Sequence, residues 1–412
     1  MKKGSQVLMY DGSVKNCEDV VINDIMMGDD STPRMVNNTS IGNGQLYTII
    51  PNDSTDSYTV SEDTIICMKS NIQPLISLSK AVKYDNERYR VVYMHIQNRY
   101  DPISLSNLST ISTKTKNFSI NLYGRENAYN QALNILDEKI NLFHNTFQLH
   151  EMYIPEYIQK FNTNSFRVAY RSGVEYQNNI VLDISPYLLG AWLGDGTSTK
   201  PQITTIDQEL IDYMYEEADR MGMKITQGKK KANISYSFIA NKQGKNCNKL
   251  YQFLKLYDLI DNKHIPVSYK INSRQNRLVL LAGLIDTDGH LHEHGTHYEI
   301  IQKNKRLSYD IVFLIRSLGF WCHIRECNKG CMYKGEYREG IYQRMTFGGY
   351  QLYEIPTKLP RKMANQCLDR KQKDPTCYSI KIKEDIIDEY YKFDFKDENK
   401  RYLLSDFTVM HC

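Results

Sequence analysis

The chain has 412 residues and a formal net charge of +4, with 41% hydrophobic and 24% charged residues. This length predicts two or three domains, and the composition excludes a disordered chain because it contains enough apolar side chains for a core. The apolar run 278–285 is far shorter than the ~20 residues of a membrane helix, so we expect no membrane partner. Nine scattered cysteines and the lack of an apolar leader favour a reducing intracellular compartment, either nucleus or cytoplasm.

The charge is distributed unevenly along the chain. Residues 1–82 carry a net charge of −4 and residues 374–412 a net charge of −3, whereas residues 300–373 carry +9. This asymmetry favours acidic ends enclosing a middle part that faces nucleic acid. An ordinary solvated surface explains the +9 equally well, so charge alone leaves both interpretations open.

Both ends of the chain have the pattern of β-structure. Residues 1–82 contain short β-rich runs such as SYTV and TIICMK, and Asp11 with Gly12 forms a typical hairpin turn. Residues 374–412 return to this pattern in EYYKFDF and RYLLSDFTVM. We therefore predict an α+β chain in which one all-β domain, made by both termini, is interrupted by an insertion.

The first inserted segment, residues 83–175, predicts a small unit of strands followed by a helix. RYRVVYMHI and NFSINLY have strand character, and apolar residues recur with helical spacing in ENAYNQALNILDEKINLF, residues 126–143. Alternating tyrosines and basic residues in this segment suit a sheet that faces DNA, although ordinary strand aromatics give the same pattern.

Two similar motifs lie 93 residues apart: LLGAWLGDG at 188–196 and LAGLIDTDG at 281–289. Each is an apolar helical run that ends in Asp-Gly, and each is followed by turn-rich sequence, a strand-like stretch and a longer helix. Gly190 and Gly194 are four residues apart, as are Gly283 and Thr287. Small residues at this spacing allow two helix backbones to approach closely, so we expect the two motif helices to pack together.

Such packing would place Asp195 and Asp288 side by side at one end of the helix pair. Carboxylates at helix C-termini are disfavoured by the helix dipole and repel each other, and a divalent cation relieves both costs. Oxygen ligands of this kind suit Mg²⁺, with phosphate and water completing the shell. One such motif alone would more simply be a buried helix with a glycine cap, but the presence of two favours a shared metal site.

LAGLIDTDG resembles the defining motif of the LAGLIDADG homing endonucleases, and LLGAWLGDG resembles their degenerate first copy. The resemblance implies a pseudo-symmetric, duplicated αββαββα domain over residues 176–373, acting as a monomer with internal two-fold symmetry. It implies Mg²⁺-dependent hydrolysis of phosphodiester bonds in both strands of a long double-stranded DNA target. Asp195 and Asp288 would then be catalytic metal ligands that share two or more Mg²⁺ ions with the scissile phosphates, and residues 83–175 would be a DNA-recognition insertion.

Two lysines are expected as basic catalytic partners in this family. Lys263, in KHIP, resembles the lysine of the family's K-N-I-P segment, and Lys358, in KLPRK, is the expected counterpart in the second repeat. A lysine near a metal-bound water or the scissile phosphate can position the water or offset charge. The segment around Lys358 suits a plain phosphate contact equally well.

The two ends, in KGSQVLMYDGS and RYLLSDFTVMHC, resemble the Hint domain of inteins, which an endonuclease insertion splits. Active members begin with Cys or Ser, carry a Thr-x-x-His motif and end in His-Asn. This sequence begins at Met1, has Thr64 where the activating histidine would stand, and ends in His411 and Cys412. We therefore expect splicing to be impaired, with His411 and Cys412 as the residues of any residual processing.

These observations predict a site-specific homing endonuclease within a degenerate intein-like scaffold. The expected domains are residues 1–82 and 374–412 for Hint, 83–175 for DNA recognition and 176–373 for the endonuclease. One alternative is an intein-type autoprocessing domain with an inactive nuclease. Another is a DNA-binding protein without catalysis, which the presence of both aspartates disfavours.

Overall fold

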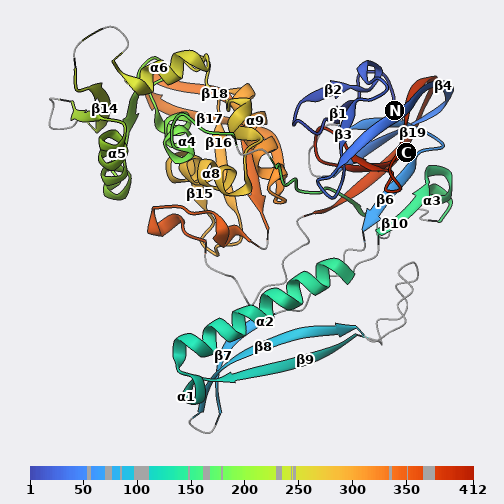
Figure 1. Ribbon diagram of the computed structural model, residues 1–412, viewed down its shortest axis with the longest axis horizontal. Helices are drawn as coiled ribbons and strands as arrows, with labels where there is room; N and C mark the ends of the chain where they lie inside the picture. Colours follow the sequence, from blue (N-terminus) through green and yellow to red (C-terminus); the bar gives the residue numbers. More distant parts are fainter. Residues whose placement is uncertain are drawn as a thin grey trace.

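The computed structural model describes residues 1–52, 57–69, 77–83, 86–96, 111–146, 149–160, 168–177, 180–228, 234–242, 244, 247–333, 336–349, 351–364 and 376–412. These residues form three bodies, which can be distinguished in Figure 1. We call them the terminal body (described residues of 1–69, 149–177 and 376–412), the insert (77–146) and the motif body (180–364). Within this described part, none of the helices has the length and apolarity needed to cross a membrane.

The terminal body is built on a nine-stranded sheet to which both ends of the chain contribute. Its strand order is β20-β21-β6-β11-β19-β4-β3, with β10 paired to β6 and β5 paired to β4. A bridge between Gly28 and Tyr402 connects the two outer strands and brings the sheet close to a barrel. The helices and strands of this body are β1 (Gln6–Leu8), β2 (Val14–Asn16), η1 (Cys17–Asp19), β3 (Ile25–Met27), β4 (Pro33–Pro51), β5 (Tyr58–Ser61), β6 (Ile65–Lys69), β10 (Leu149–Tyr153), α3 (Ile154–Lys160), β11 (Val168–Tyr170), β19 (Cys377–Phe395), β20 (Arg401–Leu403) and β21 (Val409–His411).

The ribbon of β4 and β19 joins the two ends of the chain. The two strands pair antiparallel from Pro51 opposite Ile380 to Val36 opposite Phe395. Buried side chains on these strands, including Ile49 and Phe395, contribute to one hydrophobic core of the terminal body. Strands that are more than 300 residues apart in sequence thus form one sheet, which places the two termini in the same body (Figure 1).

The insert is a three-stranded sheet covered by a helix. Its antiparallel order is β7-β8-β9, and α2 packs on one face through Val91, Phe118, Ala128, Ala132 and Leu136. The elements are β7 (Ser77–Lys83), β8 (Asn86–Ile96), β9 (Ile111–Ser119), α1 (Ile120–Tyr123) and α2 (Arg125–Thr146). The predicted helix at 126–143 is therefore present.

The limits of the insert differ from the predicted segment 83–175. Its first strand begins at Ser77, before the expected boundary. After α2 the chain returns to the terminal body, where β10 pairs with β6 and β11 pairs with β19. These two short strands extend an existing sheet, which gives them hydrogen-bond partners that their own sequence does not reveal.

The motif body contains two successive halves with similar element order. The first comprises α4 (Pro186–Asp195), β12 (Gln202–Thr204), α5 (Gln208–Arg220), β13 (Met223–Gln227), β14 (Ser235–Ala240) and α6 (Lys249–Leu256). The second comprises α7 (Val267–Lys270), α8 (Arg274–Asp288), β15 (Gly289–Leu291), β16 (Tyr298–Gln302), α9 (Lys305–Ser317), β17 (Trp321–Tyr333), β18 (Glu336–Gly348), η3 (Leu352–Glu354) and η4 (Pro360–Lys362). The strand orders are β12-β14-β13 and β15-β16-β18-β17, and a Gly196–Ile203 bridge stands in the first half where β15 pairs with β16 in the second.

The two motif helices pack backbone against backbone, as the glycine spacing predicts. A Cβ atom at Gly190 would lie 2.3 Å from the carbonyl oxygen of Leu280, and one at Gly283 would lie 2.3 Å from that of Tyr187. A Cβ at Gly194 would lie 2.0 Å from Oγ1 of Thr287. Distances this short leave no room for a side chain, so the closeness of α4 and α8 depends on these glycines.

The terminal body and the motif body share a hydrophobic contact. Ile271 of the motif body joins a buried cluster with Leu8, Phe407 and Tyr176 of the terminal body. A Cβ at Gly12 would lie 2.2 Å from Cγ2 of Ile271, so the first hairpin turn abuts the end of α7. Between the bodies, the buried Arg277 donates from Nη2 to the carbonyl oxygen of Val174 at 2.6 Å.

Candidate active site

Asp195 and Asp288 are the last residues of α4 and α8, and they interact across the helix pair. Each helix is closed by a glycine whose N–H donates to a carbonyl in the preceding turn: Gly196 to Trp192 and Gly289 to Ile285. Burial, together with the negative charge of Asp195, raises the pKa of Asp288 to about 6. Partial burial of the carboxyl group also raises the pKa of Asp195, although this residue remains open to solvent. The apposition expected from the repeat is therefore present.

Lys263 lies at the end of α4. Its Nζ donates to the carbonyl oxygens of Leu193 at 3.0 Å, Gly194 at 3.1 Å and Gly196 at 2.7 Å. The ammonium also lies 5.1 Å from the centroid of the Trp192 ring. Burial lowers the pKa of Lys263 to about 8, while the negative charges of Asp288 and Asp195 act in the opposite direction.

The matching place at the end of α8 is taken by Lys362, which sequence spacing did not single out. Its Nζ donates to the carbonyl oxygens of Ile285 and Asp286, both at 2.8 Å, and of Thr287 at 3.3 Å. Burial lowers the pKa of Lys362. The last carbonyls of a helix have no intrahelical partner and carry the negative end of its dipole, so a cation at this place satisfies both.

Lys358, the expected counterpart of Lys263, lies elsewhere. Its Nζ lies 4.7 Å from the ring centroid of Tyr213 and 5.2 Å from that of Tyr187, a cation–π arrangement. The expectation for Lys358 is therefore corrected: KLPRK contains two lysines, and the chain turns through η4 so that Lys362 reaches the helix end. Neighbouring Arg361 pairs through both Nη atoms with Asp207 of the first half, at 2.6 and 2.8 Å.

Gln302 is a further residue at the site that sequence analysis missed. Its Nε2 donates to Oδ2 of Asp288 from strand β16. The cross-strand registers place Gly289 opposite Ile300 and Gly196 opposite Ile203, so Thr205 is the residue of the first half that corresponds to Gln302. Its hydroxyl instead accepts from the N–H of Asp207 at 3.1 Å. The sequence signal for Gln302 is a polar residue at the end of the strand that follows the motif. Recognising it requires the register in which β15 pairs with β16.

The donor set at this end of the helix pair suits a hard divalent cation. Two carboxylates meet there, and each has a raised pKa, which shows that the negative charge lacks full compensation by the protein. In the described part of the chain no group of three or more His, Cys, Asp or Glu side chains is arranged to hold a metal. A cation at Asp195 and Asp288 would therefore take further ligands from water and phosphate, as Mg²⁺ commonly does.

The terminal body contains the residues expected to take part in intein-type processing. Nε2 of His411 lies 3.6 Å from Oε2 of Glu151, and its Nδ1 lies 2.6 Å from the carbonyl oxygen of Cys412. Thr64 stands where the resemblance to inteins leads us to expect the activating histidine, and its hydroxyl lies 3.2 Å from Oγ of Ser61. A hydroxyl is not a base at neutral pH, so this position cannot perform the activation expected of the missing histidine.

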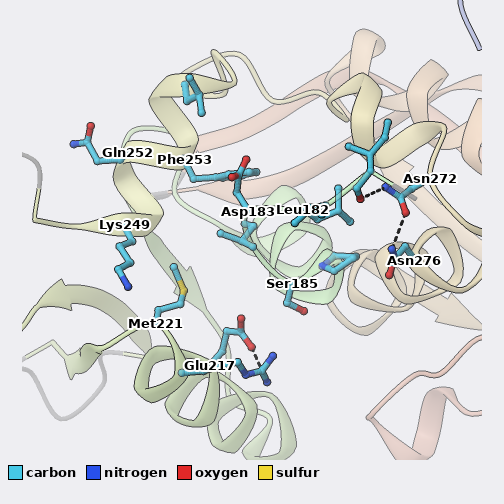
Figure 2. A pocket seen from close by; sticks show the side chains of 16 residues that line it. Leu182, Asp183, Ser185, Glu217, Met221, Lys249, Gln252, Phe253, Asn272 and Asn276 are labelled. Atoms are coloured by element: carbon cyan, nitrogen blue, oxygen red, sulfur yellow. Dashed lines mark hydrogen bonds and ion pairs between the residues drawn. The ribbon is translucent and has the colours of Figure 1, made fainter. Parts of the chain in front are cut away.

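A cavity of about 940 Å³ lies at the other end of the helix pair. Figure 2 shows Ser185, at the start of α4, and Asn272 and Asn276, at the start of α8, among its lining residues, together with Glu217 and Lys249. The two aspartates are at the opposite helix ends and are absent from the lining. This cavity and the two aspartates thus lie at opposite ends of the helix pair.

The chain matches the family described as Hom_end-associated Hint, that is, Hint associated with homing endonucleases, over residues 1–411. It belongs to this family, and the resemblance seen in its motifs is thereby confirmed. It is 39% identical over 139 residues to the replicative DNA helicase DnaB of Mycobacterium intracellulare, covering 34% of this chain and 20% of that protein. It is 28% identical over 156 residues to the homothallic switching endonuclease of Saccharomyces cerevisiae, covering 32% of this chain and 27% of that protein.

The chain thus spans only 20% and 27% of the length of these curated relatives. Two solved structures of I-DmoI, one with DNA and Ca and one of a variant with its target DNA in the presence of Mg, are each 18% identical with a TM-score of 0.27. They cover 40% of this chain and 83% and 89% of their own. A TM-score this low carries no inference about the present chain.

Proposed function

We propose that this chain is a site-specific homing endonuclease that makes metal-dependent double-strand breaks at a long DNA target. The observation that carries the proposal is the meeting of Asp195 and Asp288 at the ends of two tightly packed helices, with Lys263 and Lys362 beside them. Membership of a family of Hint domains associated with homing endonucleases supports it. The likeness between the two halves suggests a duplicated, pseudo-symmetric nuclease that acts as a monomer.

In this proposal each residue at the site has a distinct task. Bound Mg²⁺, in two or more copies, would activate water and stabilise the leaving oxygen. Asp195 and Asp288 would hold the cations, and Gln302 would orient the Asp288 carboxylate through its hydrogen bond. Lys263 and Lys362 place positive charge beside the aspartates, where it favours a phosphate that gains negative charge during hydrolysis.

The outer face of the second sheet offers a surface for DNA. Along β17 the side chains of Cys322 and Ile324 are buried, whereas those of His323 and Arg325 are exposed. Arg325 is paired directly opposite Arg344 of β18, which places two guanidinium groups on the same face. Arg344 also pairs with Glu299 at 3.6 Å, so Arg325 is the better placed of the two to contact phosphate oxygens or guanine edges in a groove.

We further propose that the terminal body is the Hint domain and that the insert recognises DNA. The face of the insert sheet opposite α2 carries Arg88 and Arg90, since Val91 points to the helix-covered face. Positive charges on the sheet face opposite α2 suit contacts to phosphate oxygens of DNA. Residues 176–373 then form the endonuclease, with the insert boundaries at about residues 77 and 146 in place of 83 and 175.

Selection of cleaved sites tests this function and identifies the target sequence in the same experiment. The purified chain is incubated with a randomised or genomic DNA library and Mg²⁺, and the cut ends are sequenced. We expect one long consensus with double-strand ends, and no such ends from Asp195→Asn or Asp288→Asn variants. A library without enriched ends would contradict the proposal.

Autoprocessing remains the second candidate, because His411 and Cys412 lie in the terminal body with Glu151 close to the His411 ring. A chain with reporter proteins fused to both ends distinguishes active autoprocessing from impaired splicing. We expect no ligated reporter product by mass spectrometry, since Thr64 replaces the activating base.

A further inference from the structure

Asp286 is the first of the two aspartates in LAGLIDTDG. Its hydrogen bonds hold its carboxylate away from the candidate metal site at Asp195 and Asp288, which we call the metal-type site. Its carboxylate is 2% exposed and lies between the two halves of the motif body. Oδ2 accepts from the hydroxyl of Tyr187 and from the N–H of Lys358, both at 2.6 Å. Oδ1 faces the N–H of Leu359 at 3.4 Å. A buried charge is retained only where donors surround it, and here two of the donors are backbone groups of one segment.

That same segment supplies the ammonium at the end of α8. Four residues after Lys358 the chain reaches Lys362, whose Nζ donates to the carbonyl oxygens of Ile285, Asp286 and Thr287. The carbonyl oxygen of Lys362 accepts from the hydroxyl of Tyr298 at 2.7 Å. The contact between α8 and this segment is therefore reciprocal: an α8 side chain holds the segment backbone, and a segment side chain holds the α8 backbone.

The first half of the motif body lacks this device. Aligning the two motifs places Leu193 where the second motif has Asp286, and Leu193 is fully buried in the hydrophobic core. Lys263 nevertheless reaches the end of α4 and donates to three carbonyls. The first half thus places a lysine at a helix end without a carboxylate at the position of Asp286. The role of the Asp286 carboxylate must therefore be specific to the second half.

We propose that Asp286 is a positioning residue that fixes residues 358–362 and thereby orients the Lys362 ammonium beside Asp288. The two acidic residues of LAGLIDTDG then have separate roles, since Asp288 faces the metal-type site and Asp286 sets the place of its basic neighbour. The placement of residues 358–362 is inferred from the contacts alone. Its consequence for cleavage rests on the proposed endonuclease function.

The geometry is tested on the metal-free, DNA-free chain by amine labelling and mass spectrometry. In Asp286→Asn, one acceptor for the backbone N–H groups becomes a donor, so the segment loosens and Lys362 becomes more accessible. Loss of the Asp286 charge by itself also lowers the pKa of Lys362, so the labelling rates compared are those of the neutral amine, obtained from the pH dependence of labelling. We expect labelling of Lys362 to rise about fivefold to tenfold, as for loss of one hydrogen bond to a charged group. Lys263 is the internal reference, and its labelling should change less than about twofold.

A second variant controls for the loss of an exposed carboxylate elsewhere in the motif body. Asp183 also accepts a tyrosine hydroxyl, that of Tyr257 at 2.7 Å, but it does not contact the lysine segment. Asp183→Asn should leave the labelling of both lysines unchanged. Equal rises at Lys263 and Lys362 in Asp286→Asn would indicate general loosening and would overturn the inference, as would no rise at either.

The catalytic consequence is tested by strand-resolved cleavage of the selected target. We expect Asp286→Asn to slow cleavage of one strand about tenfold more than the other, and Lys362→Met to slow the same strand. Adding Asp286→Asn to Lys362→Met should then cost little more. Equal slowing of both strands would overturn the positioning role. Absence of cleavage by the unmodified chain would instead refute the proposed function and leave the labelling result to stand alone.

Discussion

Lys263 and Lys362 occupy matching places in the two halves of the motif body, each donating from Nζ to three backbone carbonyls at the end of a motif helix. Asp195 and Asp288, the last residues of the two helices, thereby lie beside lysines that are at least partly buried. A carboxylate at a helix C-terminus is otherwise disfavoured by the dipole. The lysines therefore help to explain how two carboxylates can meet there before any metal is bound.

Asp288 should reduce the stability of the metal-free protein at neutral pH. Its folded-state pKa of about 6 lies above the ordinary aspartate value, so the folded chain holds this proton more tightly than the unfolded chain. Stability from this group is present below pH ~4 and is lost as pH rises through about 6. We expect Asp288→Asn to raise the free energy of unfolding by about 1–3 kcal/mol at pH 7.5 and to change it little at pH 4.

Urea unfolding of both proteins in a chelating buffer measures this difference. Mg²⁺ should reduce the difference in free energy of unfolding between the two proteins, because it stabilises only the unmodified chain. A variant that is less stable than the unmodified protein at pH 7.5 would show that the Asp288 carboxylate is compensated.

The helix contact should not tolerate a side chain at Gly283. A Cβ there would lie 2.3 Å from the carbonyl oxygen of Tyr187 and 2.8 Å from the backbone nitrogen of Ala191, so the helices must separate. We expect Gly283→Ala to lower the free energy of unfolding by about 1–3 kcal/mol or more and to abolish cleavage. Gly44→Ala is the control, because its Cβ would meet only Tyr390, at an ordinary 3.4 Å. Similar melting temperatures for the two variants would contradict close helix packing.

The contact between the terminal and motif bodies can be tested with two glycines of the same conformation. Gly4 and Gly12 have φ values of 83° and 84°, so alanine strains the backbone equally at both. A Cβ at Gly4 would meet nothing within 4 Å, whereas one at Gly12 would collide with Ile271. We expect Gly12→Ala to destabilise the chain by about 1–3 kcal/mol more than Gly4→Ala.

In an Ile271→Ala background, Gly12→Ala should cost little more than Gly4→Ala, because the colliding Cγ2 is gone. Calorimetry of the full chain supplies the measurement. Equal effects of the two glycine substitutions would show that the two bodies do not pack against each other through Gly12 and Ile271.

Lys263 should titrate in an accessible pH range. Burial brings its pKa to about 8, and Asp288 is the strongest group that opposes this lowering. Asp288→Asn should therefore lower the pKa of Lys263 further, so that its amine becomes reactive at a lower pH. The pH dependence of amine labelling, followed by mass spectrometry, reports this directly. An unchanged or higher labelling midpoint would show that the two groups do not interact.

The sequence predicted the features that depend on local spacing. Small residues four apart in both motifs predicted the close helices and the meeting of Asp195 with Asp288, because helical geometry alone puts those residues on one face. Apolar periodicity likewise predicted α2. The two ends of the chain could be recognised as β-structure because their strand-type runs lie between turn residues.

The features that could not be predicted depend on contacts between segments that are far apart in the sequence. Lys358 and Lys362 lie four residues apart in one basic segment, and only the turn at η4 decides which reaches the helix end. Gln302 needs the register of β16, and β10 needs β6 as its partner. These are tertiary relationships between distant segments, which composition and periodicity do not encode.

Cleavage of a plasmid that carries the selected target tests the central claim most directly. With Mg²⁺ the unmodified chain should convert supercoiled plasmid to linear product, whereas Asp195→Asn and Asp288→Asn should bind the same DNA without cutting either strand. Undiminished linear product from both variants would contradict the assignment of these two carboxylates as the centre of the reaction.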